Sequence, residues 1–127
     1  MRPLRFGVLA ALLVIAAQPA SAATGQAMAT GLQYFPATVG IHKGDKLVLG
    51  NFDAASVPSA GHTITETTRA SRPRFDSPPI RFGETGEING VSSVPVGTYQ
   101  FHCRVHPGMR GTLVVKPPPP PEPPTPR

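Results

Sequence analysis

The sequence predicts an all-β protein, an antiparallel Greek-key β-sandwich of seven or eight strands. Two observations predict this fold class. Short segments with two-residue periodicity alternate with turns rich in Gly, Pro and Asp along most of the chain. No segment after the N-terminal apolar run has the 3.6-residue periodicity of an amphipathic helix. Many short strands without helices between them favour two packed sheets.

Each predicted strand is bounded by a recognisable turn or loop. The segment 46–52 follows the Lys43-Gly44-Asp45 turn and is apolar at both alternating positions, as expected for a strand between two layers. The segment 62–67 is rich in β-branched residues, and the irregular Pro-rich stretch 69–79 follows it. The predicted strands are 37–42, 46–52, 62–67, one within 83–92, 97–103 and 111–116, with one more expected before Phe35.

Side-chain alternation predicts which residues of these strands face the core. Tyr99, Phe101 and Cys103 share one face of the strand 97–103, and the two aromatic rings mark that face as the inner one. His102 lies on the other face, where we expect it to be solvated. His62 opens the strand 62–67 on its inner face, so we expect it to point inward.

Residues 1–22 have the features of a secretory signal. Two arginines precede an apolar run of 12 residues, and Ala20-Ser21-Ala22 has the small-x-small pattern of a cleavage site. The alternative is an uncleaved membrane anchor, although a bilayer span needs about 20 residues. We therefore expect a periplasmic or otherwise extracytoplasmic chain that starts near Ala23 and has no stable membrane insertion.

The remaining chain reads as one domain, residues 23–116, and a tail, residues 117–127. The tail contains seven prolines after Lys116 in its first eight residues and favours a stiff polyproline II spacer that joins no sheet. Loss of the two signal arginines leaves ten basic and seven acidic residues. This mild charge, without a basic patch interleaved with aromatics, argues against nucleic-acid binding.

We expect the protein to be a monomer.

Cys103 is the only cysteine, so it has no internal disulfide partner. An idle exposed thiol is prone to oxidation outside the cytoplasm, which favours a use for it. His106-Pro107-Gly108-Met109 has the composition of a tight turn, and such a turn brings its ends within about 7 Å. An imidazole and a thioether can therefore converge beside the thiol.

A metal site built on this cluster needs one more ligand, and the inward-facing His62 is the best candidate. Two imidazoles, a thiolate and a weak axial thioether are the ligands of blue-copper electron-transfer sites. The sequence thus predicts one copper ion held by His62, Cys103, His106 and Met109. Zinc is less apt, because structural zinc sites seldom use methionine.

Other functions of the cysteine have weaker support. A buried inert thiol and an intermolecular disulfide stay open as alternatives. Catalysis with His106 as the base would need a depressed thiol pKa, but Cys103 ends a strand and does not begin a helix. No C-x-x-C-H segment is present for covalent haem, and no His-x-His pair for a multicopper oxidase. We therefore expect a protein that is not an enzyme.

The segment GTYQFHCRVHPGMRGTLVV (97–115) resembles the copper-binding end of cupredoxins of the plastocyanin and amicyanin group. YFPATVGIHKGDKLVLGNFD (34–53) is similar to their first strands, and GHTIT (61–65) to the segment with the first histidine ligand. The resemblance covers about residues 30–116 and implies the same fold and the same four ligands. Thr63 stands where many relatives have an asparagine that braces the cysteine loop.

Together these features predict a blue-copper protein that passes single electrons between a protein donor and a protein acceptor outside the cytoplasm. The alternative is a copper carrier or buffer without a redox partner. Reversible one-electron cycling distinguishes the first, and rapid copper release to a chelator distinguishes the second.

Overall fold

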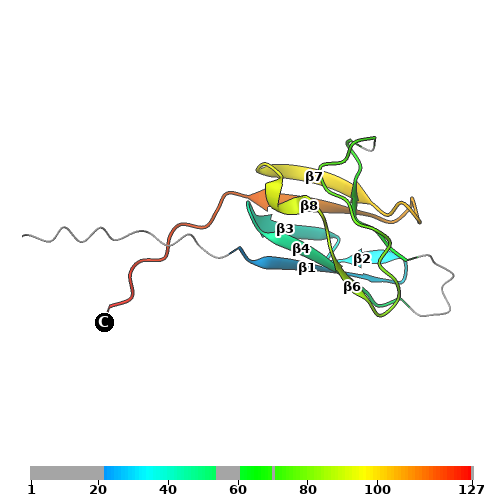
Figure 1. Cartoon of the computed structure of the whole chain (residues 1–127), viewed down its shortest axis with the longest axis horizontal. Helices are drawn as coiled ribbons and strands as arrows, with labels where there is room; N and C mark the ends of the chain where they lie inside the picture. The colour runs from blue at the N-terminus through cyan, green and yellow to red at the C-terminus, as the bar shows by residue number, and fades with distance from the viewer. Residues whose placement is uncertain (1–21, 54–60, 70, 127) are drawn as a thin grey trace, which may run out of the picture.

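Two β-sheets pack face to face in the computed structural model of the chain, which describes residues 22–53, 61–69 and 71–126 (Figure 1). Residues 54–60, which follow the predicted strand 46–52, and nearly all of the predicted signal segment lie outside the described residues. Within them, the strands are β1 (Thr24–Thr30), β2 (Gln33–Phe35), β3 (Thr38–His42), β4 (Lys46–Asn51), β5 (Thr65–Glu66), β6 (Thr85–Glu87), β7 (Gly97–His102) and β8 (Arg110–Lys116), with a short 3₁₀ helix, η1 (Val91–Ser93). No helix in this part of the chain has the length and apolar character to cross a membrane.

The β-sandwich is confirmed, but its sheets are mixed and not purely antiparallel. The strand orders are β2-β1-β4-β6 and β3-β8-β7-β5. β1 runs parallel to β4, and β3 runs parallel to β8, whereas the other neighbours are antiparallel. The chain passes through β2 in one sheet and β3 in the other before it returns as β4. β4 therefore lies beside β1 and runs in the same direction. The alternation of side chains within single strands does not reveal this parallel pairing.

Two predicted strands differ in extent from the observed ones. The region before Phe35 contains two strands, because Gly31 and Leu32 both adopt φ of 58° and reverse the chain between β1 and β2. The strand predicted at 62–67 is reduced to β5. Backbone N–H groups just before β5 donate to side chains, that of Thr63 to the Cys103 sulfur and that of Ile64 to Ser77 Oγ.

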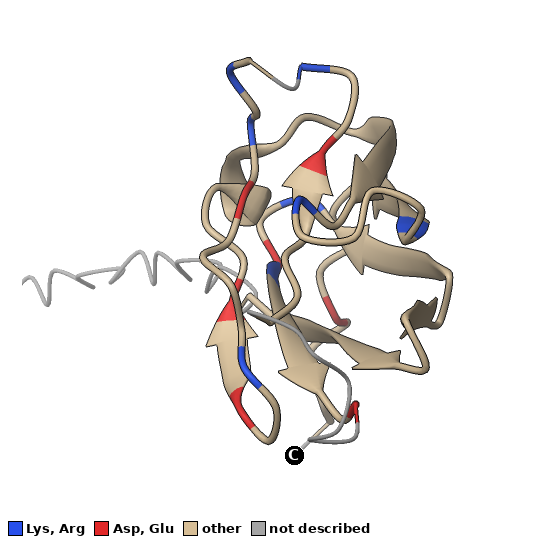
Figure 2. Cartoon of the chain, turned by 90° about the vertical axis from the view of Figure 1, so that its right-hand side faces the viewer, with Lys and Arg blue, Asp and Glu red and all other residues tan. Residues whose placement is uncertain are grey.

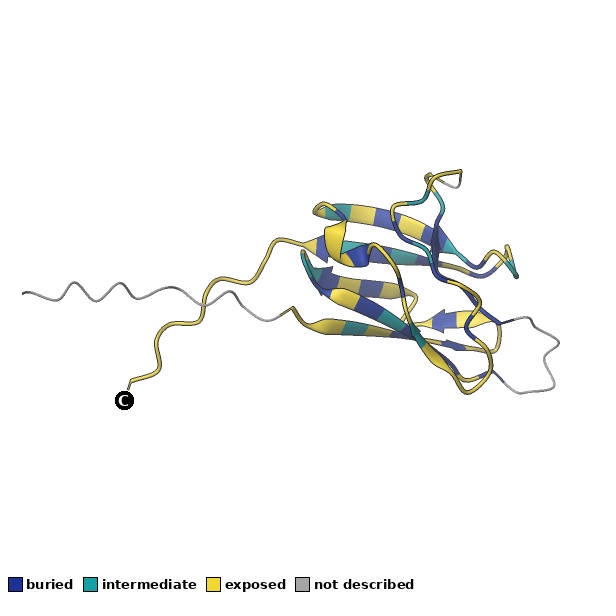
Figure 3. Cartoon of the chain, in the orientation of Figure 1, coloured by how far each residue is buried: buried dark blue, intermediate teal, exposed yellow. Residues whose placement is uncertain are grey.

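The core lies between the sheets, and buried and exposed residues alternate along the strands (Figure 3). Tyr99, Phe101 and Cys103 face inward as predicted. The Phe101 ring packs edge-on against Tyr34, with centroids 4.9 Å apart, and lies over Gly111, where a Cβ would approach the ring to 2.4 Å. Cys103 and Met109 belong to the same hydrophobic cluster. The core therefore extends directly to the end of β7 that carries the cysteine.

Candidate metal centre

Three side chains predicted to bind metal converge at one end of the sandwich. The Nδ1 atom of His62 lies 3.9 Å from the Cys103 sulfur, and the Nδ1 atom of His106 lies 3.8 Å from it. All three donor atoms lie within 4.8 Å of one another. A first-row ion binds nitrogen at about 2.0 Å and sulfur at about 2.3 Å, so two of its ligands lie at most about 4.3 Å apart. Both sulfur–nitrogen separations meet this limit.

The loop after β7 holds Cys103, His106 and Met109 together. The Met109 N–H donates to the His106 carbonyl at 2.8 Å, which is the bond of the predicted tight turn. The Cys103 N–H donates to the Met109 carbonyl at 3.0 Å, so the loop closes on itself. The Met109 side chain is buried. The soft sulfurs and imidazole nitrogens at this end of the sheet fit one copper ion.

The other two histidines, His42 and the outward-facing His102, lie apart from this cluster. The Nδ1 atom of His102 is 3.0 Å from the Thr67 hydroxyl on the outer face of its sheet. His42 ends β3, at the opposite end of the sandwich from Cys103. Neither histidine is among the donors that converge on the sulfur.

A buried carboxylate, which the sequence did not single out, orients His62. The Nε2 atom of His62 lies 2.5 Å from Asp53 Oδ2, and both side chains are almost fully buried. A carboxylate accepts a hydrogen bond, so it fixes the tautomer with the proton on Nε2 and leaves the Nδ1 lone pair facing Cys103. Metal-binding histidines commonly have such a carboxylate partner on the other ring nitrogen.

The Asp53 carboxylate is itself held in place by backbone groups. It accepts hydrogen bonds from the N–H groups of Gly31 and Leu32 in the turn between β1 and β2. Its own N–H donates to Asn51 Oδ1, and Asn51 in turn donates to the Ile80 carbonyl. Burial raises the pKa of the Asp53 carboxyl, but the hydrogen bonds from His62, Gly31 and Leu32 outweigh it and hold this pKa below its ordinary value.

Thr63 braces the cysteine loop with its hydroxyl, the role expected where relatives have asparagine. Its Oγ1 accepts a hydrogen bond from the Arg104 N–H at 3.0 Å, and its backbone N–H donates to the Cys103 sulfur at 3.3 Å. Thr65 donates to Asp76 Oδ1 at 2.6 Å, so Thr63 donates to the Thr65 hydroxyl, 3.0 Å away. The chain of donors ends on a carboxylate, and each bond polarises the next.

We expect Thr63→Val to loosen this loop without changing the shape of the side chain much. The part-buried Arg104 N–H loses its acceptor, and loss of a typical hydrogen bond costs about 0.5–1.5 kcal/mol. Denaturant unfolding of the metal-free protein should show a loss of this size, and metal release to a chelator should be faster. Thr63→Ser, which keeps the hydroxyl, is the control and should behave as the parent. Equal stability of the Val and Ser variants would show that the Thr63 hydroxyl does not stabilise the cysteine loop.

Tyr34 supports the same segment from inside the core. Its hydroxyl donates to the Thr63 carbonyl, and its ring packs against Phe101. Burial raises the pKa of the Tyr34 phenol far above its ordinary value, and the neighbouring Cys103 side chain raises it further. The phenol therefore stays protonated and acts as a donor.

His106 is the member of the cluster nearest the solvent. His62 and Cys103 are fully buried, whereas His106 is half-buried and is followed by the exposed Pro107 and Gly108. The two imidazole rings lie 4.9 Å apart and are tilted by 51°. The cluster is thus closed on the core side and approachable from the His106 side.

Solved structures share this arrangement of strands, although no protein-family model matches the chain. Amicyanin from Paracoccus versutus is 20% identical, with a TM-score of 0.55 over 78% of this chain and 85% of amicyanin. A purple cupredoxin from Nitrosopumilus maritimus is 24% identical, with a TM-score of 0.57 over 72% and 98%. The azurin Az-iso2 from Methylomonas sp. strain J is 14% identical, with a TM-score of 0.60 over 76% and 99%.

The chain has the cupredoxin fold. This confirms the resemblance noted in the segments 34–53, 61–65 and 97–115, which carry β3, β4, β7, β8 and the candidate ligands. At these levels of identity the likeness establishes the cupredoxin fold alone. The chemistry of the site rests on this chain's own residues.

Proposed function

We propose that the protein binds one copper ion through His62, Cys103, His106 and Met109 and carries single electrons between protein partners. The observation that supports this most is the convergence of two imidazole nitrogens on one buried cysteine sulfur, 3.8 and 3.9 Å away. Methionine in the same closed loop supplies the weak thioether that distinguishes blue-copper sites from zinc sites. Among solved structures with this fold, an amicyanin variant has been obtained in a reduced Cu(I) form.

The ion, when bound, supplies a one-electron Cu(II)/Cu(I) couple, and the residues around it keep its ligands in place. Asp53 fixes the ring of His62, and the Thr63 N–H fixes the Cys103 sulfur. The core side of the cluster is buried, which excludes water from the thiolate. Ligands that are held in this way move little between oxidation states, which favours fast electron transfer.

The exposed edge of the site is the expected route for electrons. His106 is half-buried, and the exposed Pro107 and Gly108 beside it leave room for a protein surface to approach. Basic and acidic positions both occur along the ribbon of the described residues that Figure 2 presents. We propose a monomer exported by its signal, with a redox donor and a redox acceptor outside the cytoplasm.

Voltammetry together with copper competition tests this function against the copper-carrier alternative. An electron-transfer protein should show a reversible one-electron wave and should retain copper against a chelator through repeated cycles. A carrier should release copper rapidly to the chelator in one oxidation state. Release on the timescale of a single cycle would therefore refute the electron-transfer proposal.

We expect Met109→Leu to keep the colour of the copper-loaded protein and to raise its reduction potential. The thioether is a weak axial donor that stabilises Cu(II) slightly more than a hydrocarbon does, and the axial ligand tunes the potential. Leucine has a similar volume, so the buried position tolerates it. Voltammetry of both proteins measures the shift, and identical potentials would show that Met109 is not an axial ligand.

A further inference from the structure

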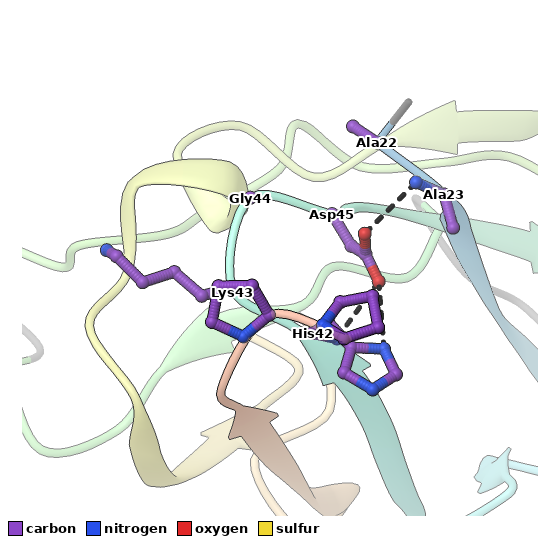
Figure 4. A pocket seen from close by; sticks show the side chains of 8 residues that line it. Ala22, Ala23, His42, Lys43, Gly44 and Asp45 are labelled. Carbon is purple, nitrogen blue, oxygen red and sulfur yellow. Dashed lines mark hydrogen bonds and ion pairs between the residues drawn. The ribbon is translucent and has the colours of Figure 1, made fainter. Parts of the chain in front are cut away.

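A second polar site lies at the end of the sandwich opposite the metal centre. A pocket of about 150 Å³ opens beside the turn between β3 and β4. Ala23, His42 and Asp45 line it, with the start of the proline-rich tail at Pro118 and Pro119 (Figure 4). Nothing in the proposed electron transfer uses these residues.

The centre of this site is the buried carboxylate of Asp45. Its Oδ1 atom accepts a hydrogen bond from the Ala23 N–H at 3.0 Å, and its Oδ2 atom accepts one from the His42 N–H at 2.9 Å (Figure 4). The His42 ring nitrogen Nδ1 is 3.8 Å from Oδ2, with a half-exposed side chain. The carboxylate thus faces the nitrogen of the residue that follows the predicted cleavage point.

The position of Ala23 does not depend on the residues before it. The Ala23 carbonyl accepts a hydrogen bond from the Lys46 N–H at 2.9 Å. The parallel register of β1 and β4 begins at the next residue, where Thr24 lies opposite Lys46. These bonds remain when the preceding peptide bond is cut, so the Ala23 nitrogen stays beside Asp45.

We propose that Asp45 is the binding site for the α-ammonium group created when the signal is cleaved between Ala22 and Ala23. A peptidase adds water across this bond, so the hydroxyl goes to the Ala22 carbonyl carbon and a proton goes to the Ala23 nitrogen. The new amine takes up a second proton from solvent and becomes an ammonium. The hydrogen bond from the neutral Ala23 amide to the Asp45 carboxylate is thereby replaced by an ion pair in which both the donor and the acceptor are charged.

This replacement changes the charges that face the Asp45 carboxylate. Before cleavage, the partners of this buried carboxylate among the described residues are two amide N–H donors and the half-exposed His42 ring. In the processed chain it faces a full positive charge, and the pocket leaves the other ammonium protons access to water. Cleavage therefore adds an ion pair between the chain's new N-terminus and the turn before β4.

The exported protein, produced from the full-length gene, tests this proposal by its intact mass and by the reactivity of its N-terminus. The mass should correspond to a chain starting at Ala23. Only unprotonated amines react with acylating reagents, and a paired carboxylate keeps an amine protonated. Peptide mapping should therefore show the Ala23 amine of the native protein acylated about tenfold more slowly than in denaturant, the factor for one unit of protonation equilibrium.

Two variants separate this pairing from general effects of folding. Asp45→Asn should remove most of the native-state protection of the Ala23 amine. Glu87→Gln, which removes a carboxylate from the exposed ion pair with Lys46, is the matched control and should keep the protection. A different N-terminal residue, or equal acylation rates for native and denatured parent protein, would overturn the proposal. The parent comparison needs no variant, so it stands even where Asp45→Asn folds poorly.

Discussion

Cys103→Ser is expected to abolish the intense visible colour of the copper-loaded protein and to weaken copper binding by more than about 100-fold, the upper range for loss of a supporting residue. The colour of a blue-copper site arises from charge transfer between thiolate and Cu(II), and serine offers no thiolate. A hydroxyl is also a poor ligand for Cu(I). Absorption spectra and competition titration with a chelator measure the two effects.

The metal-free fold should survive this substitution. Serine is close to cysteine in size, and its oxygen can accept the hydrogen bond that the Thr63 N–H donates to the sulfur. His102→Gln is the matched control, because His102 precedes Cys103 but points away from the cluster toward Thr67. It should keep both the colour and the affinity. An unchanged intense band in Cys103→Ser would refute the proposed site.

Asp53→Ala is expected to lower both stability and metal affinity. Its carboxylate is the partner of the buried His62 Nε2–H and of two N–H groups in the turn after β1. Loss of a buried acceptor leaves these donors unsatisfied and should cost about 3 kcal/mol in the free energy of unfolding of the metal-free protein. A freed His62 ring should also weaken copper binding by roughly 10–100-fold.

Asp53→Asn is the informative comparison, because the amide keeps the shape of the side chain and one oxygen acceptor. It should lie between the parent and the alanine variant in both denaturant unfolding and chelator competition. Glu87→Gln, at an exposed ion pair, should change neither quantity. Parent-like copper affinity in Asp53→Ala would show that the carboxylate does not position His62.

The sequence predicted the parts of the site that depend on local spacing. Cys103, His106 and Met109 lie in one short loop, so turn chemistry alone brings them together. His62 was predicted to face inward by strand alternation, and it is fully buried. These predictions need only the periodicity of a strand and the geometry of a four-residue turn.

The parts that were missed depend on contacts between distant segments. Asp53 follows β4, and its side chain contacts His62, which lies beyond residues 54–60 in the sequence. No strand or turn periodicity predicts a contact between these two positions. The hydrogen bonds from Thr63 to Thr65 and from Thr65 to Asp76 likewise join two segments that only the fold brings together. The parallel pairing of β1 with β4 follows from the path of the chain between sheets, which side-chain alternation does not encode.

The absorption spectrum of the copper-loaded protein, recorded through one cycle of reduction and oxidation, tests the central claim most directly. The account predicts one copper ion per chain and an intense charge-transfer band toward the red end of the visible spectrum. One electron per protein should bleach this band, and reoxidation should restore it. Weak absorption typical of Cu(II) bound only by nitrogen and oxygen, or a band that does not return, would contradict a thiolate-based electron-transfer site at Cys103.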